Sequence, residues 1–150
     1  MRAPFQILAI PYRMADGVPQ YAIFHRADHD QWQFVAGGGE YGETPPDAAR
    51  REILEECGVR ADDIMALRSV ACVPNTCFAA CHRARWERDA YVIPEYSFGF
   101  ECAQEITLSR EHTECRWVNY GQARSLLQWD SNKTALYELD CRLRDVDARK

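Results

Sequence analysis

A dense group of carboxylates marks the stretch GGGEYGETPPDAARREILEECGV, which runs from residue 37 to residue 59. Glu52, Glu55 and Glu56 lie close together near its end, and Glu43 precedes them. Like charges three or four residues apart on a helix repel each other, and each pair costs about a few tenths of a kcal/mol. Because no lysine is interleaved with these acids, the stretch predicts a positive charge that comes from outside the chain.

The same stretch predicts a helix over residues 44–58. Residues suited to the start and the end of a helix stand at its two ends: Thr44, Pro45, Pro46, Asp47 and Gly58. At about 100° per residue, the three closely spaced glutamates fall within one arc of about 100°. The neighbouring arc is apolar and would pack on a sheet: Ala49, Ile53 and Cys57. The carboxylates are therefore expected along the seam between helix and sheet.

Three carboxylates on one face of a helix suit a divalent cation. Mg²⁺ and Mn²⁺ prefer hard oxygen ligands and retain water molecules that a phosphorylated substrate can replace. The alternative is a solvated acidic face, the commonest explanation of a run of charges. That alternative leaves unexplained both the missing lysines and the three consecutive glycines, Gly37–Gly39, before the helix.

The stretch resembles the Nudix hydrolase signature, G-x5-E-x7-R-E-U-x-E-E-x-G-U, where U is a bulky aliphatic residue. Every specified position agrees: Gly37, Glu43, Arg51, Glu52, Ile53, Glu55, Glu56, Gly58 and Val59. The segments WQFVAGGGE and EHTECRWV also look like flanking strands of that family, so the resemblance spans most of the chain. It implies an α/β fold, the Nudix α/β/α sandwich, with a mixed sheet, the signature helix and a C-terminal helix.

The resemblance also implies roles for individual residues. Metal ligands in this family correspond here to Glu52, Glu55 and Glu56, to the carbonyl of Ala36, and to a glutamate from a distant loop. The segment SREHTE offers Glu111 and Glu114 for that last position, and we favour Glu111 over an exposed loop acid. Glu52 or Glu55 is the expected catalytic base. The remaining signature residues are assigned a structural role, with Glu43 paired to Arg51: Gly37, Glu43, Arg51 and Gly58.

The order of elements along the chain favours one domain over residues 1–150. Segments with β-rich or alternating patterns predict strands: residues 5–14, 20–27, 31–36, 64–75, 90–102 and 115–120. The run of glycines after residue 36 reads as a loop, and Pro94 predicts an edge or bulged strand. Residues 121–128 and 131–146 are helical by period. Such a mixture predicts a layered α/β architecture.

Composition narrows the classes of function. The chain has 150 residues and a net charge of -5, from 18 basic and 23 acidic residues, and no basic face is evident. Nucleic acid is therefore a poor partner. Apolar runs are too short for a membrane span, and no signal peptide is recognisable, so we expect a cytoplasmic protein with reduced cysteines, mostly in the core. The segment CFAACH lacks the CxxC pair of a zinc site.

The substrate is predicted less directly. Short segments resemble the dihydroneopterin triphosphate pyrophosphatases, which also accept dATP: FQILAIPY, HRADHDQWQ, EHTECRW and WDSNKTAL. Trp129 or Trp32 could stack on a flat pterin or purine ring. Arg26 and Arg85 could contact phosphate oxygens. We therefore expect a small-molecule nucleotide or pterin triphosphate as the partner, with Mg²⁺ or Mn²⁺ as cofactor.

Three alternatives stay open on the sequence. Pro74 lies fifteen residues beyond Val59, where ADP-ribose-cleaving relatives often carry proline. An enzyme that removes oxidised purine triphosphates is a second alternative. A Nudix domain that binds a ligand without hydrolysing it is the third, although such domains usually lose one of the signature acids. The sequence does not decide between a monomer and a homodimer.

Overall fold

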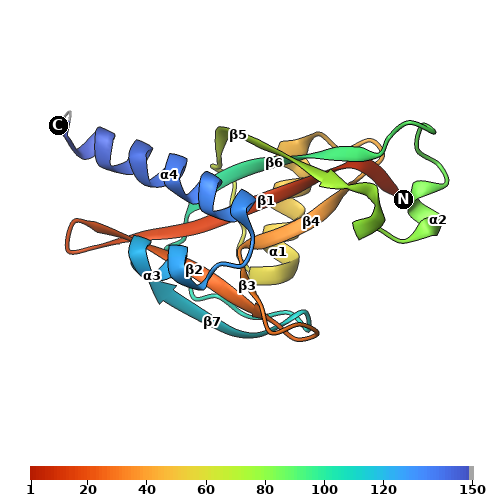
Figure 1. The fold of residues 1–150 in the computed structure, drawn as a ribbon. Helices are drawn as coiled ribbons and strands as arrows, with labels where there is room; N and C mark the ends of the chain where they lie inside the picture. Colours follow the sequence, from red (N-terminus) through yellow and green to blue (C-terminus); the bar gives the residue numbers. More distant parts are fainter. Residues whose placement is uncertain (149–150) are drawn as a thin grey trace.

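The computed structural model describes residues 1–148, which form a seven-stranded sheet with helices around it (Figure 1). The strands are β1 (Arg2–Ala15), β2 (Val18–Arg26), β3 (Trp32–Gln33), β4 (Val35–Glu40), β5 (Met65–Pro74), β6 (Val92–Glu101) and β7 (His112–Val118). The helices are α1 (Pro45–Cys57), α2 (Ala80–Arg83), α3 (Tyr120–Leu126) and α4 (Asp130–Ala148), with a short 3-10 helix at Asn75–Cys77. None of the helices in this range is both long and apolar enough to cross a membrane.

Strand β1 organises the sheet because it pairs with three other strands. It is antiparallel to β2 and to β4, and parallel to β6. Strands β3 and β7 pair with β2, and β5 pairs with β6 at the other end of the sheet. The sheet is therefore mixed, as the sequence predicted.

The two faces of β1 are buried against different helices. Ile7 packs against Ala49 of α1, whereas its neighbour Leu8 belongs to the cluster that contains Leu136 and Leu139 of α4. Successive residues of a strand point to opposite faces, so this alternation places α1 and α4 on the two sides of the sheet (Figure 1). The apolar run of β1 is thus explained by burial on both faces.

Helix α1 begins and ends as its sequence predicted. The Thr44 hydroxyl accepts a hydrogen bond from the Asp47 N–H at 3.3 Å, and two prolines occupy the first turn. Gly58 adopts φ 67°, a left-handed conformation that favours glycine, and its N–H donates to the Leu54 carbonyl. These ends fix where the acidic residues lie along the sheet.

Three local expectations were wrong. The glycines after Ala36 continue β4 instead of forming a loop, because they pair with β1. Of the two alternatives for the strand that contains Pro94, the edge strand is wrong, since β6 lies between β1 and β5, although the pairing of β6 with β5 does shift register between Ala66 and Val70. Pro94 is tolerated there because the pairing with β1 begins only at Glu95. The cysteines, expected mostly in the core, lie mostly outside it: Cys57 and Cys102 are buried, Cys115 is partly buried, and the others are exposed, namely Cys72, Cys77, Cys81 and Cys141.

Helix α4 is attached to the sheet through Glu138. The Glu138 carboxylate accepts hydrogen bonds from the backbone N–H groups of Arg68 and Ser69, both at 2.7 Å, and from the Ser69 hydroxyl. These amides lie where the pairing of β5 with β6 shifts register. Burial alone would raise the pKa of Glu138, but these donors and Arg142 hold it at about 2. Glu138 therefore stabilises the folded chain as a carboxylate.

Replacing Glu138 with glutamine should lower the free energy of unfolding by about 1–3 kcal/mol at neutral pH, because charge-assisted hydrogen bonds are lost. A folded-state pKa below the ordinary 4.5 gives stability that is present above that value and is lost as the pH falls towards about 2. The difference between wild type and E138Q in urea unfolding should therefore shrink as the pH falls from about 5 to about 2. A constant difference would contradict this role; E105Q, at an exposed acid, is the control.

Candidate active site

The three glycines of β4 each make room for a different side chain. A Cβ atom on Gly37 would lie 2.1 Å from the carboxyl carbon of Glu52. One on Gly38 would lie 2.4 Å from Arg2 Nη1, and one on Gly39 would overlap the ring of Phe5. Because Gly37 has no side chain, the Glu52 carboxyl can lie directly against the strand. The close approach of α1 to β4 thus accounts for the start of the signature.

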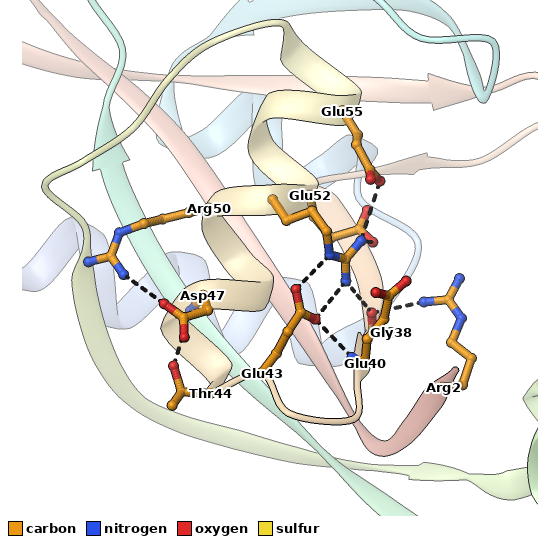
Figure 2. Close-up of polar contacts among 10 residues, drawn as sticks. Arg2, Gly38, Glu40, Glu43, Thr44, Asp47, Arg50, Glu52 and Glu55 are labelled. Carbon is orange, nitrogen blue, oxygen red and sulfur yellow. Dashed lines mark hydrogen bonds and ion pairs between the residues drawn. The ribbon is translucent and has the colours of Figure 1, made fainter.

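Arg51 is the positive group at the centre of the acids. Its Nε and Nη2 atoms donate to the two Glu43 oxygens at 2.8 and 3.0 Å, so the pairing expected from the sequence is present. Its Nη1 atom donates to Glu52 at 2.8 Å and lies 3.4 Å from a Glu55 oxygen (Figure 2). Nη2 also donates to the Gly38 carbonyl at 3.0 Å. One guanidinium therefore joins the loop, the helix and β4.

Glu56 lies deeper than its neighbours and away from Arg51. Only 2% of it is exposed, and neither carboxyl oxygen has a hydrogen-bond partner among residues 1–148. Burial raises the pKa of Glu56 to about 10, and the nearby Glu111 and Glu52 carboxylates act in the same direction, whereas the Ala36 backbone acts against it. The structure thus brings Glu56 close to the two residues expected from outside the helix, Glu111 and Ala36.

The acids open onto a cavity of about 990 Å³. Its lining includes Glu52, Glu55, Ala36 and Glu111 from the predicted metal site. Two of the three predicted substrate-binding residues also line it: Arg26 and Trp129. Arg85 does not line it; its guanidinium contacts the Met1 sulfur instead. From the same segment, His82 reaches the cavity. The segment around α2 thus forms a wall of the cavity.

Comparisons with known proteins identify the family and the fold. The NUDIX domain model matches residues 18–139. The chain belongs to the Nudix family. A crystal structure of a Nudix hydrolase from Listeria monocytogenes is 45% identical, with a TM-score of 0.84 and 97% of each chain covered. The predicted α/β Nudix fold is therefore confirmed.

Two further Nudix relatives have named substrates. The dihydroneopterin triphosphate diphosphatase of Escherichia coli is 28% identical over 90% of this chain and 91% of its own. An RNA pyrophosphohydrolase of a Sulfurovum strain is 45% identical, but the match covers 31% of this chain and only 30% of that enzyme. The family acts on phosphoanhydride bonds and generally uses divalent metal ions.

The residues present fit a divalent cation. Buried carboxylate oxygens need a proton, donors or a metal, and the Glu56 oxygens receive no hydrogen bond from the described part of the chain. The other donors nearby are also hard oxygens, which suit Mg²⁺ or Mn²⁺. As they stand, no three His, Cys, Asp or Glu side chains within residues 1–148 converge on one point at metal-binding distance. Glu52 is instead turned to Arg51, so a cation bound here would share the Glu52 carboxylate with that guanidinium.

Sequence reasoning missed several polar residues that line the Nudix cavity. Arg2 reaches it from the first strand and donates to the Gly38 carbonyl at 2.8 Å. Gln6 and Glu95 form a part of its surface at a distance from the acids of α1. Glu95 carried one usable signal, a charged residue inside the apolar run of β6. Arg2 and Gln6 carried none, because their position depends on strand pairing.

The metal-free protein should become less stable as the pH rises, because of Glu56. Its pKa is about 10 in the folded chain and has the ordinary value of 4.5 when exposed. The folded state therefore holds the proton more tightly, and stability falls between these two values, by on the order of 1 kcal/mol per pH unit at most. The thermal midpoint of wild type, measured with chelator, should drop relative to that of Glu56→Gln between about pH 6 and pH 9.

Glu105→Gln, which changes an exposed acid, should follow wild type in the same scans. If the thermal midpoints of wild type and Glu56→Gln changed in parallel across this pH range, the pKa of Glu56 would not be raised by folding, and the prediction would be wrong.

Proposed function

We propose that this Nudix protein hydrolyses a phosphoanhydride bond of a nucleoside or pterin triphosphate and releases pyrophosphate and a monophosphate. The observation that carries the proposal is a set of acids, Glu52, Glu55 and Glu111, that line a cavity large enough for such a molecule, with Arg51 among them and Glu56 buried behind them. The intact signature favours an enzyme over a Nudix domain that only binds its ligand.

In the proposed reaction, some residues position the carboxylates and others accept the proton of the attacking water. Arg51 holds Glu52 and Glu55 in place through its Nη1 atom, and Gly37 leaves space for Glu52. A water oxygen forms a bond to phosphorus, the phosphoanhydride P–O bond breaks, and pyrophosphate leaves with the bonding electrons. The proton of the water passes to one of the two carboxylates, Glu52 or Glu55, both of which line the cavity.

Glu52, Glu55, Glu56, Glu111 and the Ala36 carbonyl are the groups that would hold the cation. A bound Mg²⁺ or Mn²⁺ supplies positive charge to the phosphoryl oxygens and makes water easier to deprotonate. Positive side chains of the cavity add to that charge: Arg2 and Arg26 both line it. Arg26 is already paired with Asp28 at 2.7 Å, so Arg2 is the stronger choice for a phosphate contact.

ADP-ribose is the second candidate substrate, supported by one observation. Pro74, the residue that suggested this group, ends β5 and lines the cavity. A Shewanella oneidensis Nudix domain crystallised with ADP ribose shares the fold at 12% identity, with a TM-score of 0.69. That likeness concerns the fold alone, so the products of the reaction must decide.

Incubation with Mg²⁺ and a panel of compounds tests the proposed reaction. Release of pyrophosphate from dATP, dGTP or dihydroneopterin triphosphate is the expected result. Release of AMP and ribose 5-phosphate from ADP-ribose would transfer the assignment to the second candidate. A 5′-triphosphorylated RNA belongs in the panel because of the Sulfurovum relative. Glu56→Gln should reduce turnover about 100-fold or more while keeping the fold, and unchanged turnover would remove Glu56 from the site.

Mg²⁺ should raise the thermal midpoint of the wild type, because a cation relieves the repulsion among the acids only in the folded state. Saturating millimolar Mg²⁺ should add about 3–8 °C, since binding at 100 times the dissociation constant contributes about 2.7 kcal/mol. Glu56→Gln should show a much smaller shift. Sodium chloride at the same ionic strength is the control, and an equal effect of both salts would argue against a specific cation site.

A further inference from the structure

A row of four residues crosses the sheet at the floor of the cavity. In register, Ala71 of β5 pairs with Glu95 of β6, Glu95 with Gln6 of β1, and Gln6 with Gly38 of β4. Paired residues of neighbouring strands project to the same face, and all four line the cavity. Since Ala71 and Gly38 are small, Glu95 and Gln6 supply the functional groups of this row.

This row lies on the face of the sheet opposite α1. Gln6 precedes Ile7, which packs against α1, so Gln6 and its partner Glu95 point to the α4 side. The cavity is therefore lined by acids of α1 from one face of the sheet and by Glu95 from the other. Glu95 is not part of the Nudix signature and does not belong to the proposed cation site.

Glu95 is buried without a compensating charge. Only 4% of it is exposed, and no ion pair reaches it from residues 1–148. Its Oε2 atom accepts a hydrogen bond from Gln6 Nε2 at 2.5 Å, whereas Oε1 has no hydrogen-bond partner in the described chain. Burial raises the pKa of Glu95, and Gln6 and Ser131 offset only part of that effect. An apolar residue would serve the fold better, which points to a ligand.

The first residues of α4 complete this end of the cavity. Trp129, Ser131 and Asn132 all line it. The Trp129 ring system is available to a ligand, since the residue is 48% exposed. Asn132 is buried and fixed, because its Oδ1 atom accepts a hydrogen bond from the Phe34 N–H at 3.1 Å. A flat heterocycle would thus find an aromatic surface and a carboxylate in the same cavity.

We propose that Glu95 selects substrates whose heterocycle presents two adjacent N–H donors, a ring N–H and an exocyclic amino group, in a triphosphate held as under the proposed function. Guanine and pterins share this edge. A carboxylate can accept two parallel hydrogen bonds from such a pair. Oε1 of Glu95 is buried and has no hydrogen-bond partner in the described chain, so a ligand that displaces its surroundings would satisfy it. Adenine presents an exocyclic amino donor beside a ring nitrogen that carries a lone pair. That lone pair would repel a carboxylate oxygen placed to accept the second hydrogen bond.

The sharpest test compares dGTP with dITP, because the two differ only by the exocyclic amino group. Wild type should favour dGTP by about 10- to 100-fold in kcat/KM, since a site built for a polar group discriminates against its absence. Glu95→Gln should lose most of this preference, because dGTP hydrolysis falls more than dITP hydrolysis, and it should lose dihydroneopterin triphosphate hydrolysis to a similar extent as dGTP. Glu101→Gln, at an exposed acid on the same strand, is the matched control and should retain the wild-type preference.

Binding of the same two nucleotides, measured by calorimetry on the Glu56→Gln background with Mg²⁺, separates this inference from the proposed reaction. Tighter binding of dGTP that disappears on adding Glu95→Gln supports the role of Glu95 even if no substrate is turned over. Hydrolysis of both nucleotides at equal rates, unaffected by Glu95→Gln, would keep the pyrophosphohydrolase and overturn the role of Glu95. A thermal midpoint of Glu95→Gln equal to or above that of wild type is expected, and would show that the carboxylate is not needed for folding.

Discussion

The close contact between α1 and β4 is the constraint on which the rest of the site depends. The Glu52 carboxyl rests against Gly37, and the Arg51 guanidinium joins Glu43, Glu52 and the Gly38 carbonyl. A single delocalised cation with donors in a fixed fork can make all these contacts at once, which a lysine cannot. Arg51 thereby holds the like-charged Glu43, Glu52 and Glu55 close together. Glu56 does not contact Arg51, so its carboxyl oxygens could still bind a cation.

Two kinds of chemistry meet in one cavity but come from different parts of the chain. Most of the acids proposed for the reaction come from one continuous stretch, and Glu111 joins them from a distant loop. The row on the opposite face is assembled from β1, β4, β5 and β6. A fold that separates reacting groups from selecting groups in this way can change its substrate without altering its catalytic helix.

Local sequence was sufficient for the helix and its ends, because these depend on residues a few positions apart. The Glu43–Arg51 pair followed from the family resemblance, and the mixed α/β class from the order of elements along the chain. Local sequence was insufficient where strand pairing decides. Gln6 and Glu95 are 89 positions apart and meet only through the parallel pairing of β1 with β6. The glycines of β4 suggested a loop because three glycines in a row are typical of loops. Their role here is to make room for side chains from other elements, which the local sequence does not show. Arg85 suggested a phosphate contact by its charge alone.

The anchoring of α4 has a consequence for how this protein can diverge. Glu138 accepts hydrogen bonds from the irregular part of β5. About two turns earlier, on or just before the same helix, lie three cavity residues: Trp129, Ser131 and Asn132. Ala71 of β5 also lines the cavity, so an insertion or deletion near Arg68 and Ser69 would disturb the contact with α4 and the β5 part of the cavity together. The acids of α1 have no such contact with β5, so ligand choice could change with those acids left in place.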